Sequence, residues 1–141
     1  MRPRRVGPIF WALIFGLRCG PAIAGPIERA AKKYNIDPKI LWAIYHIETS
    51  GGRNVRLKTN KNRTQDKGPF QINSVHWHTN CKAYDVGRLD GASLCAAKLL
   101  ARHRRAAPHD PYWMGRYHST TLHRKINYAK KIQQYIKGVS K

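Results

Sequence analysis

The sequence predicts a single, mainly α-helical domain of the α+β class, with a small irregular or β-hairpin region around residues 53–75. Three observations lead to this prediction. The chain has 141 residues, a length typical of one domain. Apolar residues recur at helical spacing through most of the chain after residue 25. Residues 53–67, in contrast, are polar and rich in turn formers.

The first 24 residues have the features of a secretory signal peptide. A basic start, MRPRR, precedes an apolar run of 12 residues, and the small residues AIA end at Ala24. These features predict export to the periplasm, cleavage after Ala24 and a mature domain of residues 25–141. An uncleaved anchor is the alternative, but the apolar run is short for a membrane span.

The net charge restricts the classes of partner. The chain has 27 Lys and Arg against 7 Asp and Glu, which gives a net charge of +20. Nucleic acid, an acidic membrane and an anionic cell-wall polymer all suit such a charge. Because few exported proteins of this size meet chromosomal DNA, we expect no nucleic-acid partner. We also expect a monomer with no stable membrane insertion after cleavage.

Two helices are expected before residue 52. The first covers residues 26–36, and the second covers residues 38–49, with Asp37 as its N-cap. Gly51 and Gly52 end the second helix. Each helix has one face of similarly spaced side chains: Ile27, Ala30, Ala31 and Tyr34 on the first, and Leu41, Ile44, Tyr45 and Glu48 on the second.

A turn-rich segment and two more helices follow. Residues 53–67 are expected to form a loop or short hairpin, with Asn60 and Asn62 as turn formers. Residues 68–73 form a tight turn into a short apolar piece. The third helix is expected over residues 92–105, capped by Asp90 or Ser93, and the last over residues 123–137, ended by Gly138.

Two cysteines remain in the predicted mature domain, Cys81 and Cys95. In an oxidising compartment such a pair suggests a disulfide, and two free buried thiols are the alternative. The closed loop of about 15 residues corresponds to about 3 kcal/mol of stabilisation. His76 and His78 lie near Cys81, but a metal site needs a further ligand, so we expect no metal and no cofactor.

Two carboxylates are the candidates for chemistry. Glu48 lies at the C-terminal end of an apolar helix, where the helix dipole and desolvation both raise the pKa of a carboxyl group, as a general acid requires. Asp66 follows 18 residues later, beyond the turn-rich loop. Two carboxylates placed in this way can flank a glycosidic bond. The alternatives are an exposed glutamate without a role and an ordinary turn aspartate.

Four motifs in order carry a resemblance to a known family. They are AIYHIETSGG around Glu48, GPFQIN from Gly68 to Asn73, GRYHS from Gly115 to Ser119, and Tyr128 in INYAKKI. Over residues 26–137 the sequence resembles the lytic transglycosylases of the lysozyme superfamily, in particular the branch tied to bacterial secretion, conjugation and pilus systems. The resemblance implies a lysozyme-like fold.

The resemblance also implies an activity, a substrate and partners. Such enzymes cleave the bond between MurNAc and GlcNAc in peptidoglycan and leave a 1,6-anhydro sugar, with Glu48 as the acid and then the base. Asp66 would be an auxiliary carboxylate. Glycan strands would be the substrate and components of a secretion, conjugation or pilus apparatus the partners. The implied substrate-binding residues are Thr49, Gly68, Gln71, Asn73, Tyr117, His118 and Tyr128.

Three departures from the family pattern affect the expected substrate contacts. Thr49 stands where the family usually has serine, Pro69 replaces a leucine, and His118 replaces an asparagine. Two other functions also stay open: a hydrolytic muramidase that uses Glu48 with Asp66, and a basic peptidoglycan-binding module without activity.

Overall fold

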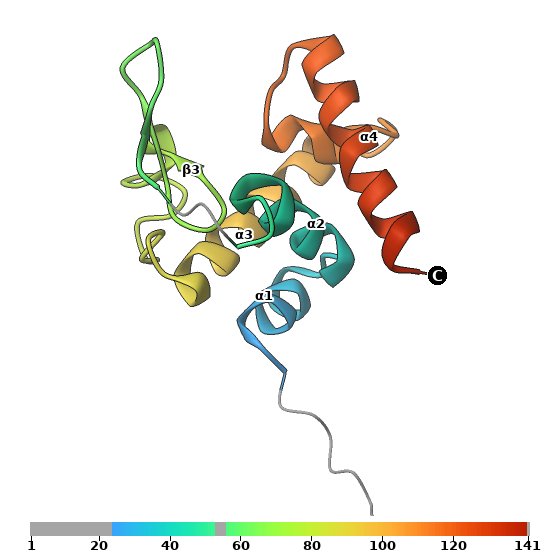
Figure 1. The fold of residues 1–141 in the computed structure, drawn as a ribbon, viewed down its shortest axis with the longest axis horizontal. Helices are drawn as coiled ribbons and strands as arrows, with labels where there is room; N and C mark the ends of the chain where they lie inside the picture. Colours follow the sequence, from blue (N-terminus) through green and yellow to red (C-terminus); the bar gives the residue numbers. More distant parts are fainter. Residues whose placement is uncertain (1–23, 53–55, 141) are drawn as a thin grey trace, which may run out of the picture.

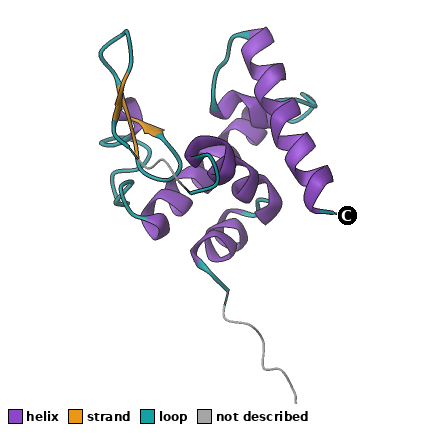
Figure 2. Ribbon diagram, in the orientation of Figure 1, coloured by secondary structure: helices purple, strands orange, loops and turns teal. Residues whose placement is uncertain are grey.

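The protein is a mainly helical domain with a small antiparallel sheet (Figures 1 and 2). The computed structural model describes residues 24–52 and 56–140, so the predicted signal peptide lies, except for Ala24, outside the described residues. The helices are α1 (Pro26–Tyr34), α2 (Pro38–Thr49), α3 (Leu89–Ala106) and α4 (Leu122–Val139), with short 3-10 helices η1 (Ser74–His76) and η2 (Trp113–Tyr117). The strands are β1 (Lys58–Thr59), β2 (Gln65–Lys67) and β3 (Ile72–Asn73).

Helix α2 begins and ends close to the positions that the sequence predicts. The Asp37 side chain accepts a hydrogen bond from the backbone N–H of Lys39 (2.9 Å), which confirms Asp37 as the N-cap. Ser50 adopts a left-handed conformation (φ 51°) and closes the helix, ahead of Gly51 and Gly52, which also have positive φ. The chain therefore leaves the helix directly after Glu48 and Thr49.

The predicted hairpin is present and a third strand extends it. In β1 and β2, Lys58 pairs with Asp66, and β2 in turn pairs Asp66 with Asn73 of β3. A Cβ atom at Gly68 would lie 1.9 Å from the carbonyl oxygen of Val86, and φ there is +77°. Only glycine fits such a turn, which brings β3 back beside β2.

Helix α3 is the centre of the core, and its start differs from the prediction. It begins at Leu89, three residues before the expected start, and neither Asp90 nor Ser93 caps it. Ser93 is buried one turn inside, where its hydroxyl donates to the carbonyl oxygen of Leu89 (2.6 Å). Packing decides this start, because Gly91 lies against the backbone of Asp85 with no room for a Cβ atom.

Helix α4 also runs past its predicted end. Gly138 lies within the helix, which continues to Val139. Gly138 does not adopt the left-handed conformation with which a glycine commonly ends a helix. Tyr128, Ala129 and Ile132 form the buried stripe of α4. This stripe packs against α2, and Figure 1 shows α4 on the opposite side of the central helices from the sheet.

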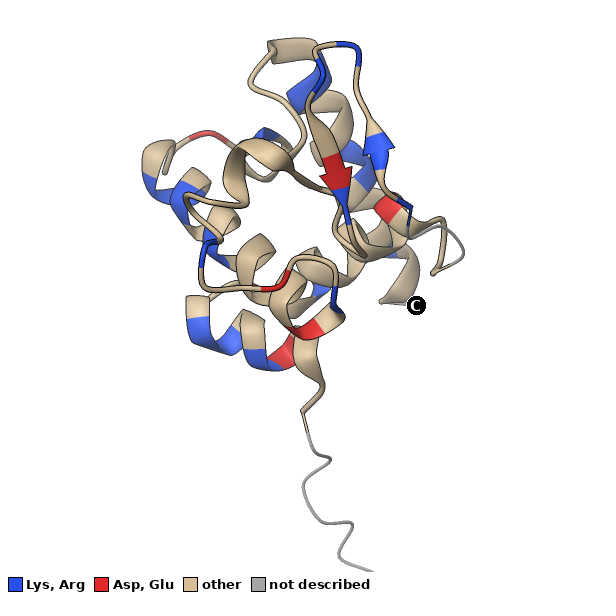
Figure 3. Ribbon diagram, turned by 90° about the vertical axis from the view of Figure 1, so that its left-hand side faces the viewer, with Lys and Arg blue, Asp and Glu red and all other residues tan. Residues whose placement is uncertain are grey.

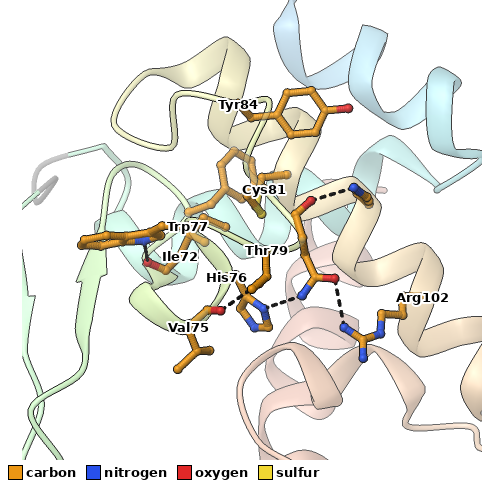
Figure 4. Close-up of a disulfide and its surroundings, with 12 residues drawn as sticks. Ile72, Val75, His76, Trp77, Thr79, Cys81, Tyr84 and Arg102 are labelled. Carbon is orange, nitrogen blue, oxygen red and sulfur yellow. Dashed lines mark hydrogen bonds between the residues drawn. A yellow bond between two sulfur atoms is a disulfide. The ribbon is translucent and has the colours of Figure 1, made fainter.

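The predicted disulfide joins Cys81 and Cys95 (Figure 4). Both residues are fully buried, and the bond ties the segment after η1 to helix α3. The backbone N–H of Cys81 also donates to the carbonyl oxygen of His76 (2.9 Å), so η1 is held against the same helix. Within the two described ranges, none of the helices combines the length and apolar character needed to cross a membrane.

Candidate functional site

A groove of about 820 Å³ separates the sheet from the helical side of the domain. Glu48, at the end of α2, lies in its wall. The sheet side contributes Lys58, Asn60, Asn62, Thr64, Asp66, Gln71 and Asn73, and the opposite side contributes Arg102, His103, Arg116, Tyr117, His118 and Arg124. The structure therefore brings both candidate carboxylates into one cavity.

A second, smaller cavity of about 330 Å³ meets the groove at Glu48. Glu48, His118 and Arg124 line both cavities, while Tyr128 and Lys131 line the smaller one. An extended polymer can thus lie on both sides of the Glu48 carboxyl group. Such an arrangement suits cleavage within a chain, because the scissile bond then has occupied positions on each side.

The Glu48 carboxyl group has a raised pKa. Burial is the main cause, and the negative charge of Asp66 adds to it. The Tyr128 hydroxyl donates a hydrogen bond to Oε1 of Glu48, and this bond partly opposes the increase in pKa. Lys58 and Lys131 oppose it further. The net effect is a raised pKa for a carboxyl group that lines the groove, which is the direction that a general acid working near neutral pH requires.

An aromatic wall surrounds Glu48. The rings of His118 and Tyr128 are stacked, with centroids 4.8 Å apart. Tyr117 lies beside Tyr128, with centroids 6.5 Å apart, and its hydroxyl donates to the carbonyl oxygen of Phe70 (2.7 Å). Burial raises the pKa of both tyrosines, so both remain neutral donors at physiological pH. Tyr117 thereby joins the helical side to the turn before β3.

His118 is neutral at physiological pH. Partial burial lowers its pKa, and the positive charges of Lys131, Arg124 and Lys58 lower it further. A neutral imidazole has one donor nitrogen and one acceptor nitrogen. An asparagine amide likewise has a donor nitrogen and an acceptor oxygen. His118 therefore offers the same two hydrogen-bonding functions as an asparagine side chain would offer next to Glu48.

Asp66 is oriented by two asparagine amides. Asn73 Nδ2 donates to Oδ1 (2.8 Å) and Asn60 Nδ2 donates to Oδ2 (3.0 Å). Asn73 and Asn60 also both reach the hydroxyl of Thr64. The sequence predicted Asn60 only as a turn residue. Its contact with Asp66 depends on the pairing of β1 with β2, which local sequence does not reveal.

Among the other predicted substrate-binding residues, Gln71 and Asn73 line the groove, and Thr49 and Gly68 do not. Thr49 is fully buried; its hydroxyl donates to the carbonyl oxygen of Tyr45 (2.6 Å) and accepts from the N–H of Gly52 (2.7 Å). Gly68 is buried in its turn. Both residues shape the backbone around Glu48 and Gln71.

The basic residues on the helical side of the groove are the part that sequence reasoning missed. Arg102, Arg116, Arg124 and Lys131 line the two cavities, although nothing in their local sequence separates them from the other cations of the chain. Figure 3 shows how far Lys and Arg outnumber Asp and Glu along the ribbon. The groove is consequently positive in most places and suits an anionic ligand.

Within the described ranges, no group of three or more His, Cys, Asp and Glu side chains is arranged to hold a metal ion. Comparison of the sequence with protein-family models and with curated proteins found no match.

Proposed function

We propose that this protein is a peptidoglycan lytic transglycosylase with a lysozyme-like fold. It acts in the periplasm, where it opens the cell wall locally for a secretion, conjugation or pilus apparatus. Three features support the proposal: the sequence motifs around Glu48, the predicted export, and a long groove between a helical side and a small sheet.

The observation that carries the proposal is the position of Glu48. Its carboxyl group has a raised pKa, receives a hydrogen bond from Tyr128 and lies where two cavities meet. A protonated acid at such a point can donate its proton to the oxygen of a glycosidic bond that crosses from one cavity to the other.

One acid is sufficient for the proposed reaction. Glu48 protonates the glycosidic oxygen, and the bond between that oxygen and C1 of MurNAc breaks. The N-acetyl group of the same sugar stabilises the positive charge. The Glu48 carboxylate then removes the proton of the 6-hydroxyl group, whose oxygen closes the 1,6-anhydro ring. The reaction consumes no water and returns Glu48 to its protonated form.

The test compares the digestion of purified sacculi by the wild-type protein and by Glu48→Gln. We expect 1,6-anhydroMurNAc products from the wild type, seen by mass spectrometry, and a loss of activity of about a thousandfold in the variant. Glu28→Gln is the matched control, because Glu28 accepts a hydrogen bond from Trp42 Nε1 (2.8 Å), outside the groove. Unchanged lysis by Glu48→Gln would contradict the proposal.

A hydrolytic muramidase is the second candidate, and the location of Asp66 favours it. Asp66 lies in the same groove, and its charge acts on Glu48. A second carboxylate can serve as nucleophile or activate water. Reducing MurNAc ends without anhydro sugar, lost in Asp66→Asn, would identify this reaction in place of the first.

A further inference from the structure

One end of the groove contains a cluster of cationic and imidazole side chains that the proposed reaction does not use. It is formed by His76 of η1, Arg102 and His103 of α3, and Arg116 of η2. We refer to these four residues as the basic end of the groove. They come from three segments of the chain that only the fold brings together.

Arg116 is the least satisfied member of the basic end. Its Nε atom is buried and has no hydrogen-bond partner in the part of the chain that the structure describes. Asp110 is the carboxylate whose charge reaches Arg116, but its oxygens already accept from Lys125 Nζ (2.6 Å) and from the N–H of Tyr112 (2.9 Å). A buried guanidinium N–H without an acceptor is costly. Because Nε is closed to solvent, a ligand in the groove can meet only the Nη atoms of the same guanidinium group.

Arg102 is held in position by a network that involves the disulfide loop (Figure 4). Its Nη1 donates to Oδ1 of Asn80 (3.1 Å), and Nδ2 of Asn80 donates to Nδ1 of His76 (2.9 Å). Lys98 Nζ donates to the carbonyl oxygen of Asn80 (2.7 Å). Only one guanidinium nitrogen of Arg102 is used in this network, so the others remain available as donors to a ligand.

The two histidines of the basic end are neutral. Burial lowers the pKa of His103 to about 4, with Arg116 and Arg102 adding to the decrease, and burial and Arg102 lower the pKa of His76. Because Nδ1 of His76 accepts from Asn80, its proton is on Nε2, which is then a further donor. The basic end therefore offers two guanidinium groups and an imidazole N–H.

We propose that Arg116 and Arg102 bind a carboxylate of the peptide stem that a muramyl residue carries, next to the bond that Glu48 cleaves. This inference rests on the proposed function, which supplies the substrate. Two guanidinium groups suit a planar carboxylate, since each can donate two parallel hydrogen bonds. The basic end shares a single cavity with Glu48, so a stem on a neighbouring sugar has a place within the groove.

The test measures binding without cleavage. In a Glu48→Gln background, with the disulfide intact, calorimetry compares GlcNAc–MurNAc-tetrapeptide with the same compound after amidation of its carboxylates. We expect the free-acid compound to bind about tenfold more tightly. Arg116→Gln should remove this preference, and Arg102→Gln should reduce it. Arg105→Gln, an exposed position on the same helix outside the groove, is the charge-matched control and should keep the preference.

The outcomes separate this inference from the proposed function. Equal affinity for the two compounds, or the same loss in Arg105→Gln as in Arg116→Gln, overturns the carboxylate site whatever the activity on sacculi. A preference that depends on Arg116, in a protein whose wild type releases no sugar from sacculi, supports the site and contradicts the enzyme.

Discussion

The two sides of the groove hold their carboxyl groups in opposite ways. On the helical side, Glu48 lies at the end of α2 among aromatic rings, and burial raises its pKa. On the sheet side, Asp66 lies in a strand and accepts hydrogen bonds from Asn60 and Asn73. Burial without full compensation raises the pKa of Glu48, whereas the two amide donors fix the orientation of the Asp66 carboxyl group.

One cavity thus contains a carboxyl group that packing largely buries and another that amide donors orient. The helical side partly buries Glu48 through packing, and the Tyr128 hydroxyl donates a hydrogen bond to it. Strands β1 and β2 have no buried side chain, and the sheet side is held by turn hydrogen bonds, by the buried side chains of Phe70 and Ile72, and by the neighbouring disulfide. The four changes below act on one side at a time.

The largest effect is expected from Glu48→Gln, which should abolish lysis and also stabilise the fold at neutral pH. A carboxyl group whose folded-state pKa is raised favours the folded state at low pH, and this contribution is lost as the pH rises through the folded-state pKa. The gain of the variant in melting temperature should therefore be absent below about pH 4 and grow as the pH rises above the unfolded value, near 4.5. A variant less stable than the wild type at pH 7 would show that burial does not strain Glu48.

Removal of the disulfide comes next in size. Cys81→Ser with Cys95→Ser should lower the free energy of unfolding by about 3 kcal/mol, because the unfolded chain regains the freedom of the closed loop. Denaturant titration measures this change. In the pH profile of lysis we expect activity to fall on the alkaline side as Glu48 loses its proton. Since the disulfide supports η1 and not α2, this alkaline limb should stay at the same pH in the variant, measured well below its melting temperature. A shifted limb would mean that the two sides are coupled.

Asp66→Asn should lower activity by about tenfold if Glu48 acts as the only proton donor and acceptor. The loss of the negative charge also lowers the pKa of Glu48, because that charge raises it in the wild type. The alkaline limb of the pH profile should move to lower pH. A loss as large as that of Glu48→Gln would assign Asp66 a direct role and support hydrolysis.

Tyr128→Phe should have the smallest effect, a few-fold decrease in lysis from poorer positioning of Glu48. The hydrogen bond from Tyr128 lowers the pKa of Glu48, so its removal should move the alkaline limb to higher pH, opposite to Asp66→Asn. Tyr135→Phe, on the same helix but outside both cavities, is the control. A shift of the alkaline limb in the same direction in Tyr128→Phe and in Asp66→Asn would contradict the contrast between the two sides.

Local sequence predicted the elements where the signal is short-range. The Asp37 cap, the end of α2 after Glu48 and the β1–β2 hairpin depend on neighbouring residues, and the structure confirms them. The start of α3 and the end of α4 were predicted wrongly. In α3 the packing of Gly91 against Asp85 outweighs the capping preference of Asp90 and Ser93. In α4, Gly138 does not adopt the left-handed conformation of a helix-ending glycine, so the helix continues through it.

The sequence by itself determined the candidate acid, the disulfide pair and the order of the helices, because apolar spacing and turn residues act over a few positions. Only the tertiary structure decided that Thr49 is buried, that Asn60 orients Asp66, and that Arg102 and Arg116 share a cavity with Glu48. Residues so far apart in the chain become neighbours through the packing of α2, α3, η2 and the sheet. A cation that lines a groove and one that faces bulk solvent have the same local sequence, and only the fold separates them.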